Sequence, residues 1–156
     1  MDNSIRLCCP CHFGLESVLK FEINKIGGTD LKVSDGKISF SGDENMIARA
    51  NICLATAERV LIELGEFRAV TFEELFQGVK ALPLERFIGK TDAFPVKGYS
   101  LNSALHSVPD CQSIIKKAAV ERLKGVYGVS WFDESGPAVQ IKFSILKDLV
   151  SVYLDT

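Results

Sequence analysis

The order of strand and helix patterns in the first 67 residues constrains the fold more than any other feature of the sequence. A short apolar run at residues 5–9 predicts a strand, which Pro10 stops. Residues 14–26 place apolar side chains at helical spacing, and two glycines follow the last of them. Two alternating segments come next, joined at residues 34–36 by Ser-Asp-Gly, which indicates a β-hairpin.

A second helical pattern opens at Gly42-Asp43, and residues 60–64 add a fourth strand. The resulting order, β-α-β-β-α-β, is that of a ferredoxin-like unit. We therefore predict an N-terminal ferredoxin-like domain over residues 1–67.

The remaining residues, 68–156, predict a second α+β domain. Residues 67–70 form a junction, and Thr71 then opens a helix with Glu74 in the position of a capping box. After a further helical turn at residues 84–88, the expected elements are a strand over 93–97, a polar loop over 98–107, a helix over 107–125, and strands over 129–132, 139–145 and 149–154.

Residues 94–125 are the stretch most suggestive of binding. The loop supplies hydroxyl groups from Ser100, Ser103 and Ser107, which can contact phosphate oxygens. In the helix that follows, we expect Ser107 to cap the start with Asp110 three residues on, and Gly125 to end it. The predicted buried face is Cys111, Ile115, Ala118, Ala119 and Leu123, and the predicted outer face carries Lys116, Lys117 and Lys124. A basic helix after a hydroxyl-rich loop suits a phosphate backbone, although lysines on a solvated helix are also ordinary.

The net charge of −2 argues against a strongly basic, generic nucleic-acid binder, but the charge is unevenly distributed. Residues 1–67 hold 7 basic and 10 acidic residues, whereas residues 90–124 hold 6 and 3. An anionic partner is therefore expected on the second half of the chain.

Cysteine usage indicates a reducing compartment. Five cysteines are present, an odd number, and three of them crowd into the segment Cys8 to Cys11, which is a poor disulfide framework. The cluster continues to His12 and suggests a metal, but structural zinc usually takes paired ligands from two separate places, and no second pair exists here. We therefore predict no metal site and interpret these cysteines as core residues at the end of a strand.

The sequence carries no pattern that predicts catalysis. There is no glycine-rich nucleotide loop, and no nucleophile–base pair can be named from the sequence around the two histidines, His12 and His106. No apolar run approaches the roughly 20 residues of a membrane span, and the N-terminus does not resemble a signal peptide. These observations predict a cytoplasmic binding protein that does not contact a membrane and is not itself an enzyme.

Four short segments carry a resemblance to a known family. In order along the chain they are Cys9-Pro10-x-x-Phe13-Gly14-Leu15-Glu16, Thr56-Ala57-x-Arg59-Val60-Leu61, Thr71-Phe72-Glu73-Glu74-Leu75, and Asp110-Cys111-Gln112-x-x-x-Lys116-Lys117-Ala118. Together they resemble the N-terminal part of bacterial THUMP-domain RNA methyltransferases. The nearest group is the 23S rRNA guanine-N2 methyltransferases, whose Gram-positive members are often labelled N6-adenine-specific DNA methylases.

This resemblance implies a ferredoxin-like domain, then a THUMP domain that binds structured RNA, then a methyltransferase domain that uses S-adenosylmethionine. The glycine loop and the Asn/Asp-Pro-Pro-Tyr motif of that last domain are missing here. The resemblance therefore implies a truncated protein, with no cofactor and no catalysis in these 156 residues. Its implied partners are structured RNA, in particular 23S rRNA, and its own methyltransferase domain.

The resemblance also implies which residues contact RNA. The implied surface comprises Lys97, Ser100, Ser103, Ser107, Gln112, Lys116, Lys117, Arg122 and Lys124. Two alternatives stay open from the sequence. The chain could belong to a DNA adenine-N6 methylase, or it could be a protein-interaction module that does not bind nucleic acid.

Overall fold

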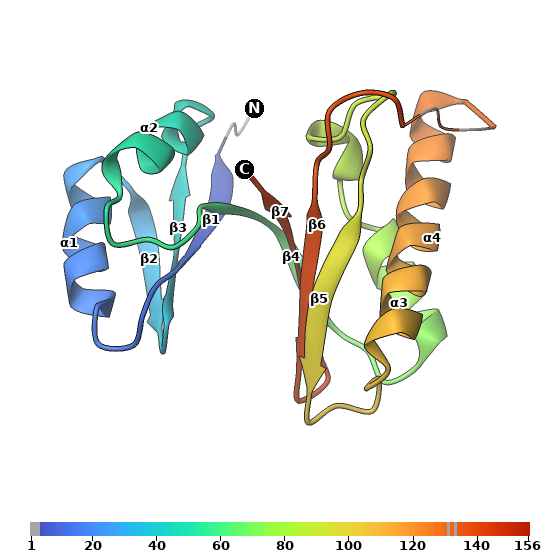
Figure 1. Cartoon of the computed structure of the whole chain (residues 1–156), viewed down its shortest axis with the longest axis horizontal. Coiled ribbons are helices and arrows are strands. Elements are labelled where there is room, and N and C mark those ends of the chain that lie inside the picture. Colours follow the sequence, from blue (N-terminus) through green and yellow to red (C-terminus); the bar gives the residue numbers. More distant parts are fainter. Residues whose placement is uncertain (1–3, 131, 133) are drawn as a thin grey trace. The chain divides into compact units, whose positions relative to one another are not determined.

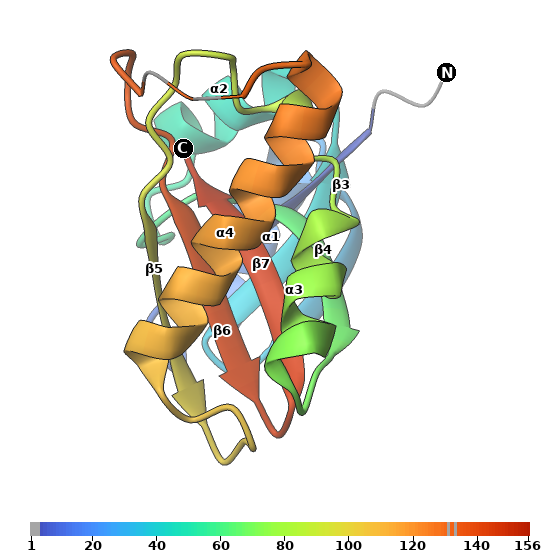
Figure 2. The same cartoon turned by 90° about the vertical axis from the view of Figure 1, so that its right-hand side faces the viewer.

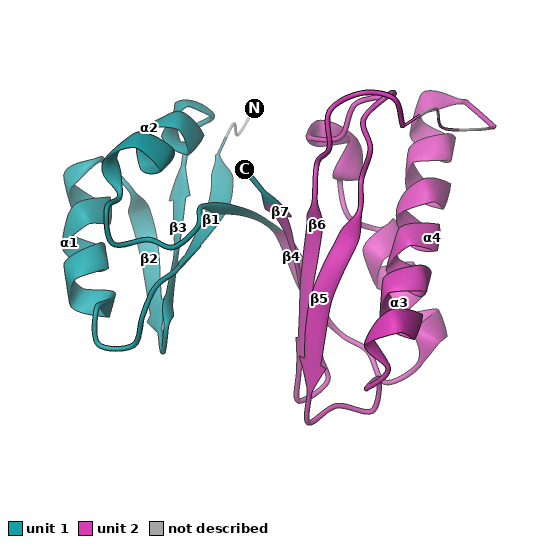
Figure 3. Cartoon of the chain, in the orientation of Figure 1, with its two compact units in different colours: residues 1–63, 155–156 teal, residues 64–154 magenta. Residues whose placement is uncertain are grey.

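The structure is a computed structural model that describes residues 4–130, 132 and 134–156 (Figure 1). The chain divides into two compact units (Figure 3). The first, unit 1, comprises residues 1–63 and 155–156, and the second, unit 2, comprises residues 64–154. The predicted domain division after residue 67 stays a prediction.

Unit 1 has the predicted β-α-β-β-α-β order. Strand β1 (Ile5–Pro10) lies between β3 (Lys37–Gly42) and the first residues of β4 (Leu61–Arg68), antiparallel to both, and β2 (Thr29–Ser34) pairs with β3 as a hairpin. Helices α1 (Glu16–Lys25) and α2 (Asn45–Cys53) lie on one face of these strands (Figure 1). The ferredoxin-like prediction is confirmed.

The core of unit 1 contains the residues that alternation and helical spacing place inward. Leu7, Leu19, Ile23, Ile38 and Phe40 are completely buried. Val18 is one of the apolar residues that helical spacing places on the inner side of residues 14–26, but it is half exposed, because α1 buries only a narrow stripe.

The cysteines of β1 lie in this core, as predicted from their position at a strand end. Cys8, Cys9 and Cys11 are buried and form no disulfide. Burial, reinforced by the two neighbouring thiols, raises the pKa of Cys9 to about 12. The Cys9 thiol therefore stays protonated at neutral pH and behaves as a small apolar side chain.

The last two residues of the described chain belong to unit 1 (Figure 3). The Thr156 hydroxyl donates to the carbonyl of Val60 at 2.6 Å and accepts from the Asn51 amide at 3.1 Å. Arg59 forms an ion pair with Asp155 at 2.9 Å. Unit 1 is therefore completed by two residues that lie 96 positions after their partners Arg59 and Val60 in the sequence.

Unit 2 is a sheet with its helices on one face (Figure 2). Its strands follow the order β4-β7-β6-β5, in which β6 (Ile141–Leu146) and β7 (Leu149–Asp155) form an antiparallel hairpin and β5 (Val96–Leu101) runs parallel to β6. Helices α3 (Phe72–Lys80) and α4 (Val108–Tyr127) cover this face, and the 3-10 helix η1 (Leu84–Arg86) follows α3. The α4 residues predicted to face inward, from Cys111 to Leu123, are all buried.

Several predicted boundaries in unit 2 are wrong. Strand β4 continues to Arg68, into the first two residues of the junction expected at 67–70. Strand β5 begins and ends later than predicted, because its pairing with β6 extends to Leu101 and includes residues 98–101 of the expected polar loop. Val129, Ser130 and Phe132 lie outside any strand, while Trp131 is outside the described residues. Phe132 instead packs edge-on against Phe94, with ring centroids 5.8 Å apart.

The predicted ends of α4 are also wrong. The Ser107 side chain makes no capping hydrogen bond, although its carbonyl accepts the first helical bond from Cys111. The helix runs past Gly125 and ends at Gly128, which adopts the left-handed conformation with φ of 66°. A left-handed position is the one that favours glycine, so Gly128 and not Gly125 is the C-cap.

Candidate nucleic-acid interface

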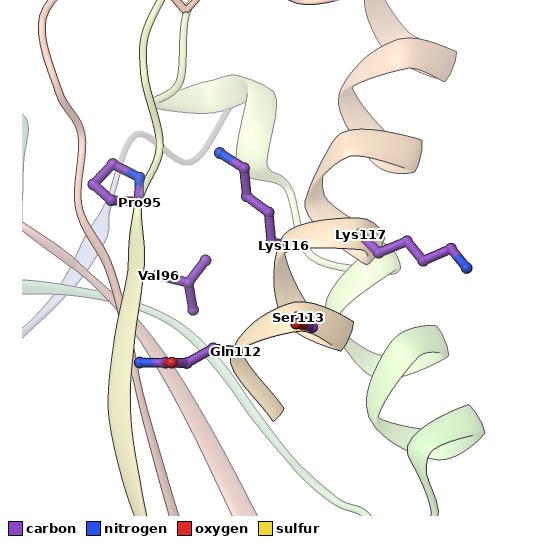
Figure 4. Close-up of a pocket in the computed structure, with 6 residues that line it drawn as sticks. All are labelled: Pro95, Val96, Gln112, Ser113, Lys116 and Lys117. Carbon is purple, nitrogen blue, oxygen red and sulfur yellow. The ribbon is translucent and has the colours of Figure 1, made fainter. Parts of the chain in front are cut away.

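A shallow pocket lies between the start of β5 and the first turns of α4 (Figure 4). It encloses about 440 Å³ and is lined by Pro95, Val96, Gln112, Ser113, Lys116 and Lys117. Figure 4 shows Gln112 and Lys116 reaching towards β5, whereas Lys117 points away from it. Two of the predicted helix lysines, 116 and 117, therefore extend in different directions.

Lys116 is held by groups of its own unit. Its Nζ donates to a Glu134 carboxylate oxygen at 2.6 Å and to the Phe94 carbonyl at 3.0 Å, and it lies 3.7 Å from the centre of the Phe94 ring. The hydrogen bond from Lys116 lowers the pKa of Glu134 despite partial burial. The charge of Lys116 is thus largely balanced before any ligand arrives. The sequence places Glu134 between two predicted strands, at residues 129–132 and 139–145, and nothing in its local context distinguishes it.

Arg122 is also engaged within unit 2. Its Nε and Nη2 donate to the two carboxylate oxygens of Glu85, at 3.0 and 2.6 Å, in a bidentate arrangement. The hydrogen bond lowers the pKa of Glu85 and raises that of Arg122. The Tyr127 hydroxyl donates to the Ile88 carbonyl at 2.6 Å nearby. These contacts hold α4 against η1 and against Ile88, which follows η1. Arg122 therefore has a structural role.

The serine hydroxyls are turned towards the protein backbone. Ser100 donates to the Leu105 carbonyl at 2.6 Å, and Ser103 donates to the Leu101 carbonyl at 2.9 Å while accepting from the amide of Asp148 at 2.9 Å. Ser107 is half-buried at the helix start. The loop between β5 and α4 is therefore ordered by its own hydroxyl groups.

Three of the predicted lysines form no ion pair within the residues that the structure describes: Lys97, Lys117 and Lys124. Lys117 and Lys124 are seven residues apart on α4, so they share one outer stripe of the helix. Glu121 is exposed on the same stripe and reduces its net charge. Lys97 belongs to β5, one residue after the pocket-lining Val96, so its side chain emerges on the opposite face of the sheet.

Two protein families match the chain. The family described as "RlmL ferredoxin-like domain" matches residues 6–61, and the family described as "THUMP domain" matches residues 69–155. The chain belongs to the THUMP-domain family. The matched THUMP segment contains all nine residues that the sequence predicted as an RNA-binding surface.

Several similar proteins have the same two-domain region. "Putative RNA methyltransferase YpsC" of Bacillus subtilis (strain 168) is 43% identical over 152 residues, which is 96% of this chain and 39% of that protein. A crystal structure of a predicted N6-adenine-specific DNA methylase from Listeria monocytogenes str. 4b F2365 is 44% identical, with a TM-score of 0.94, over 98% of this chain and 40% of that one.

A second structure is described as "SMU.472, a putative methyltransferase complexed with SAH". It is 39% identical, with a TM-score of 0.94, over 100% of this chain and 42% of that one. This THUMP chain thus spans about 40% of the length of each of these relatives. The two family matches together confirm the predicted family resemblance and the predicted α+β fold class.

Within the described residues, no helix is both long enough and apolar enough to cross a bilayer.

Proposed function

We propose that this chain binds structured RNA through its THUMP unit and presents that RNA to an S-adenosylmethionine-dependent methyltransferase domain of the same protein. The THUMP match over residues 69–155 is the observation that carries the proposal. The methyltransferase names of the relatives support the second part, as does the SAH complex of one of them. At the finest level, we propose 23S rRNA as the substrate and the N2 atom of a guanine as the methyl acceptor.

The structure modifies which residues are proposed to contact RNA. Lys117 and Lys124 are the leading phosphate contacts on α4, because they have no carboxylate partner among the described residues. Gln112 can add a hydrogen bond from the pocket between them and β5. Lys116, Arg122, Ser100 and Ser103 support this surface indirectly, because each is hydrogen-bonded within unit 2. Recognition would depend mainly on shape, because A-form RNA hides its base edges in a deep groove.

The described residues do not fit a site for S-adenosylmethionine. The glycines with positive φ lie at turns and helix ends: Gly14, Gly27, Gly36 and Gly128. None of them follows the carboxyl end of a parallel strand, which is where an open α/β sheet binds such a cofactor. We therefore place cofactor binding and catalysis outside these residues.

Fluorescence anisotropy across a salt series tests the RNA proposal. The chain is titrated into a labelled rRNA hairpin and, in parallel, into a DNA duplex. The double variant Lys117→Ala/Lys124→Ala is expected to weaken RNA binding and to reduce the magnitude of the salt slope by about 1.4–1.8, since each lost phosphate contact removes about 0.7–0.9. The matched control is Lys20→Ala/Lys25→Ala, two exposed lysines on α1 of unit 1.

Three results would count against the proposal. Absence of RNA binding would refute it. Equal losses in both double variants would mean that binding is non-specific. A clear preference for the DNA duplex would favour the alternative of a DNA adenine-N6 methylase, for which the description of the Listeria structure is the supporting observation.

A further inference from the structure

The two helices of unit 1 expose large apolar side chains. Phe21 of α1 is 68% exposed, Ile52 of α2 is 83% exposed, and Val18 of α1 is 48% exposed. A single apolar residue on a surface is ordinary, whereas several that lie together indicate an interaction site. Whether these three side chains form such a site depends on which side of each helix carries them.

Val18 and Phe21 lie on the side of α1 that faces the end of α2. Glu22 marks this side, because its two carboxylate oxygens accept hydrogen bonds from the amides of Ala55 and Thr56, at 2.8 and 3.1 Å, just after α2 ends. Val18 precedes Phe21 by three residues and Glu22 by four, so all three share one side of the helix. The exposed apolar groups of α1 therefore border α2.

Ile52 lies on the side of α2 that faces α1. Arg49 marks this side, because its Nη1 donates a hydrogen bond to the carbonyl of Ile26, just after α1 ends, at 3.3 Å. Ile52 and Cys53 follow Arg49 by three and four residues and so share its side of the helix. The facing sides of the two helices therefore carry all three exposed apolar side chains.

Val18, Phe21 and Ile52 thus form one apolar surface, the helix-pair patch, and its setting favours a protein as the occupant. Residues 1–67 hold 7 basic and 10 acidic residues, so this part of the chain repels a phosphate backbone. Within unit 1, α1 packs on β2 and β3, at the opposite end of the strand order from β4, through which the chain continues into unit 2. An apolar protein surface is the ligand that such a patch accommodates best.

The last residue of the chain lies against the same helix pair. Thr156 accepts a hydrogen bond from the Asn51 side chain of α2 at 3.1 Å, so a segment that follows Thr156 begins beside the residue before Ile52. The chain spans only 39–42% of the length of its similar proteins. Of the possible occupants, the domain that follows Thr156 therefore starts nearest to the helix-pair patch.

We propose that the helix-pair patch is the docking surface for the methyltransferase domain of the intact protein. This inference rests on the second part of the proposed function, since it assigns a contact surface to the domain that receives the RNA. Docking would bury Phe21 and Ile52 beneath apolar side chains of that domain. It would hold the catalytic domain against unit 1 and leave α4 of unit 2 to bind RNA.

Cys53 provides a direct test. It follows Ile52 on the same side of α2 and is exposed, whereas the other four cysteines of this chain are buried. The rate at which a bulky maleimide labels Cys53 is measured by peptide mass spectrometry, in the 156-residue chain and in the intact protein that continues past Thr156. We expect rapid labelling in the 156-residue chain and slow labelling in the intact protein, because the docked domain excludes the reagent.

Substitutions in the patch should remove this protection. In the intact protein, Phe21→Ala is expected to raise the Cys53 labelling rate roughly 10- to 150-fold, up to the rate of the 156-residue chain, which is the factor that burial of one large apolar side chain contributes to docking. Val18→Ala should raise the rate by a smaller factor. The matched control is Val33→Ala, because Val33 is 49% exposed but lies on β2, and it should leave the rate unchanged.

Three results would overturn the inference. The first is equal labelling of Cys53 in the 156-residue chain and in the intact protein. The second is slow labelling in the 156-residue chain itself, which would mean that unit 2 covers the patch, or a second copy if the rate falls as the protein concentration rises. The third is protection in the intact protein that survives Phe21→Ala or is relieved equally by Val33→Ala.

The labelling experiment contains no RNA, so its failure and the failure of the proposed RNA binding are distinguishable. RNA binding by the 156-residue chain together with an unprotected Cys53 in the intact protein would overturn only this inference. Protection of Cys53 that Phe21→Ala relieves, in a protein that does not bind RNA, would overturn only the RNA-binding proposal.

Discussion

Replacing Lys116 with methionine tests whether this residue is a structural element of the THUMP unit. The variant keeps most of the side-chain length but removes the ion pair to Glu134, the hydrogen bond to the Phe94 carbonyl and the contact with the Phe94 ring. Both ionic side chains are partly exposed, 33% for Lys116 and 37% for Glu134, so solvent screens the pair.

The expected loss follows from three partial contributions. An exposed ion pair contributes about 0.2–1 kcal/mol, a hydrogen bond about 0.5–1.5 kcal/mol and an exposed cation–π contact about 0.5–1 kcal/mol. The three contributions all involve the Lys116 ammonium, so their energies are not additive. The methionine side chain also keeps some of the packing contacts of the lysine. We therefore expect the free energy of unfolding to fall by about 1–2 kcal/mol, within the range of these contributions.

Urea denaturation measures this loss. The control is Lys117→Met at the next position, which is exposed and makes no ion pair among the described residues; it should change the free energy of unfolding by less than about 0.5 kcal/mol. If the two variants unfold at the same urea concentration with equal m-values, Lys116 does not have the structural role assigned to it.

The same pair predicts a pH dependence. Because Lys116 lowers the pKa of Glu134 in the folded state, the pair stabilises the protein above the ordinary carboxyl value of 4.5. That contribution is lost as the pH falls through the lowered, folded-state pKa. The difference in unfolding free energy between the wild type and Lys116→Met should therefore be constant near neutral pH and shrink below 4.5. A difference that grows on acidification would refute the assignment.

Two further predictions concern the helices of unit 2, and urea denaturation monitored by circular dichroism tests both. Gly125→Ala should stabilise the protein by about 0.5–1 kcal/mol, because the position is inside α4 and a Cβ there meets no other atom. Gly128→Ala should destabilise the protein by about 1 kcal/mol, because Gly128 has a positive φ. Thr71→Ala should lower the free energy of unfolding by about 0.5–2 kcal/mol, because the Thr71 hydroxyl accepts a hydrogen bond from the Glu74 amide at 3.1 Å. Ser107→Ala should lower it by less than about 0.5 kcal/mol, because the Ser107 side chain makes no capping hydrogen bond. The reverse order within either pair of variants would contradict these cap assignments.

The elements and their buried faces were predictable because they follow local periodicity. The 3.6-residue spacing from Cys111 to Leu123 identified the inner face of α4, and the capping box at Thr71 identified the start of α3. The boundaries of β5 were not predictable, because Gly98 and the polar side chains around it are typical of a loop. Only pairing with β6, some forty residues later in the chain, extends that strand to Leu101.

The RNA-binding role of the candidate site stays a prediction, but the structure shows how its residues are arranged. Helical spacing predicted Lys117 and Lys124 on the outer side of α4, and neither residue is buried. Lys116 is paired with Glu134, 18 residues away in the sequence, and Arg122 is paired with Glu85, 37 residues away. Such pairs depend on tertiary packing, so no local pattern shows that these two cations are already neutralised.

The position of Asp155 and Thr156 has a consequence for how the protein is made. The ribosome releases residues 1–63 early, but the side chains that close this unit, through Arg59, Val60 and Asn51, emerge only after all of unit 2 has been synthesised. The N-terminal unit therefore cannot reach its final structure during its own translation. Its completion depends on synthesis of the THUMP half, so a ribosome that stalls before residue 155 leaves unit 1 unfinished.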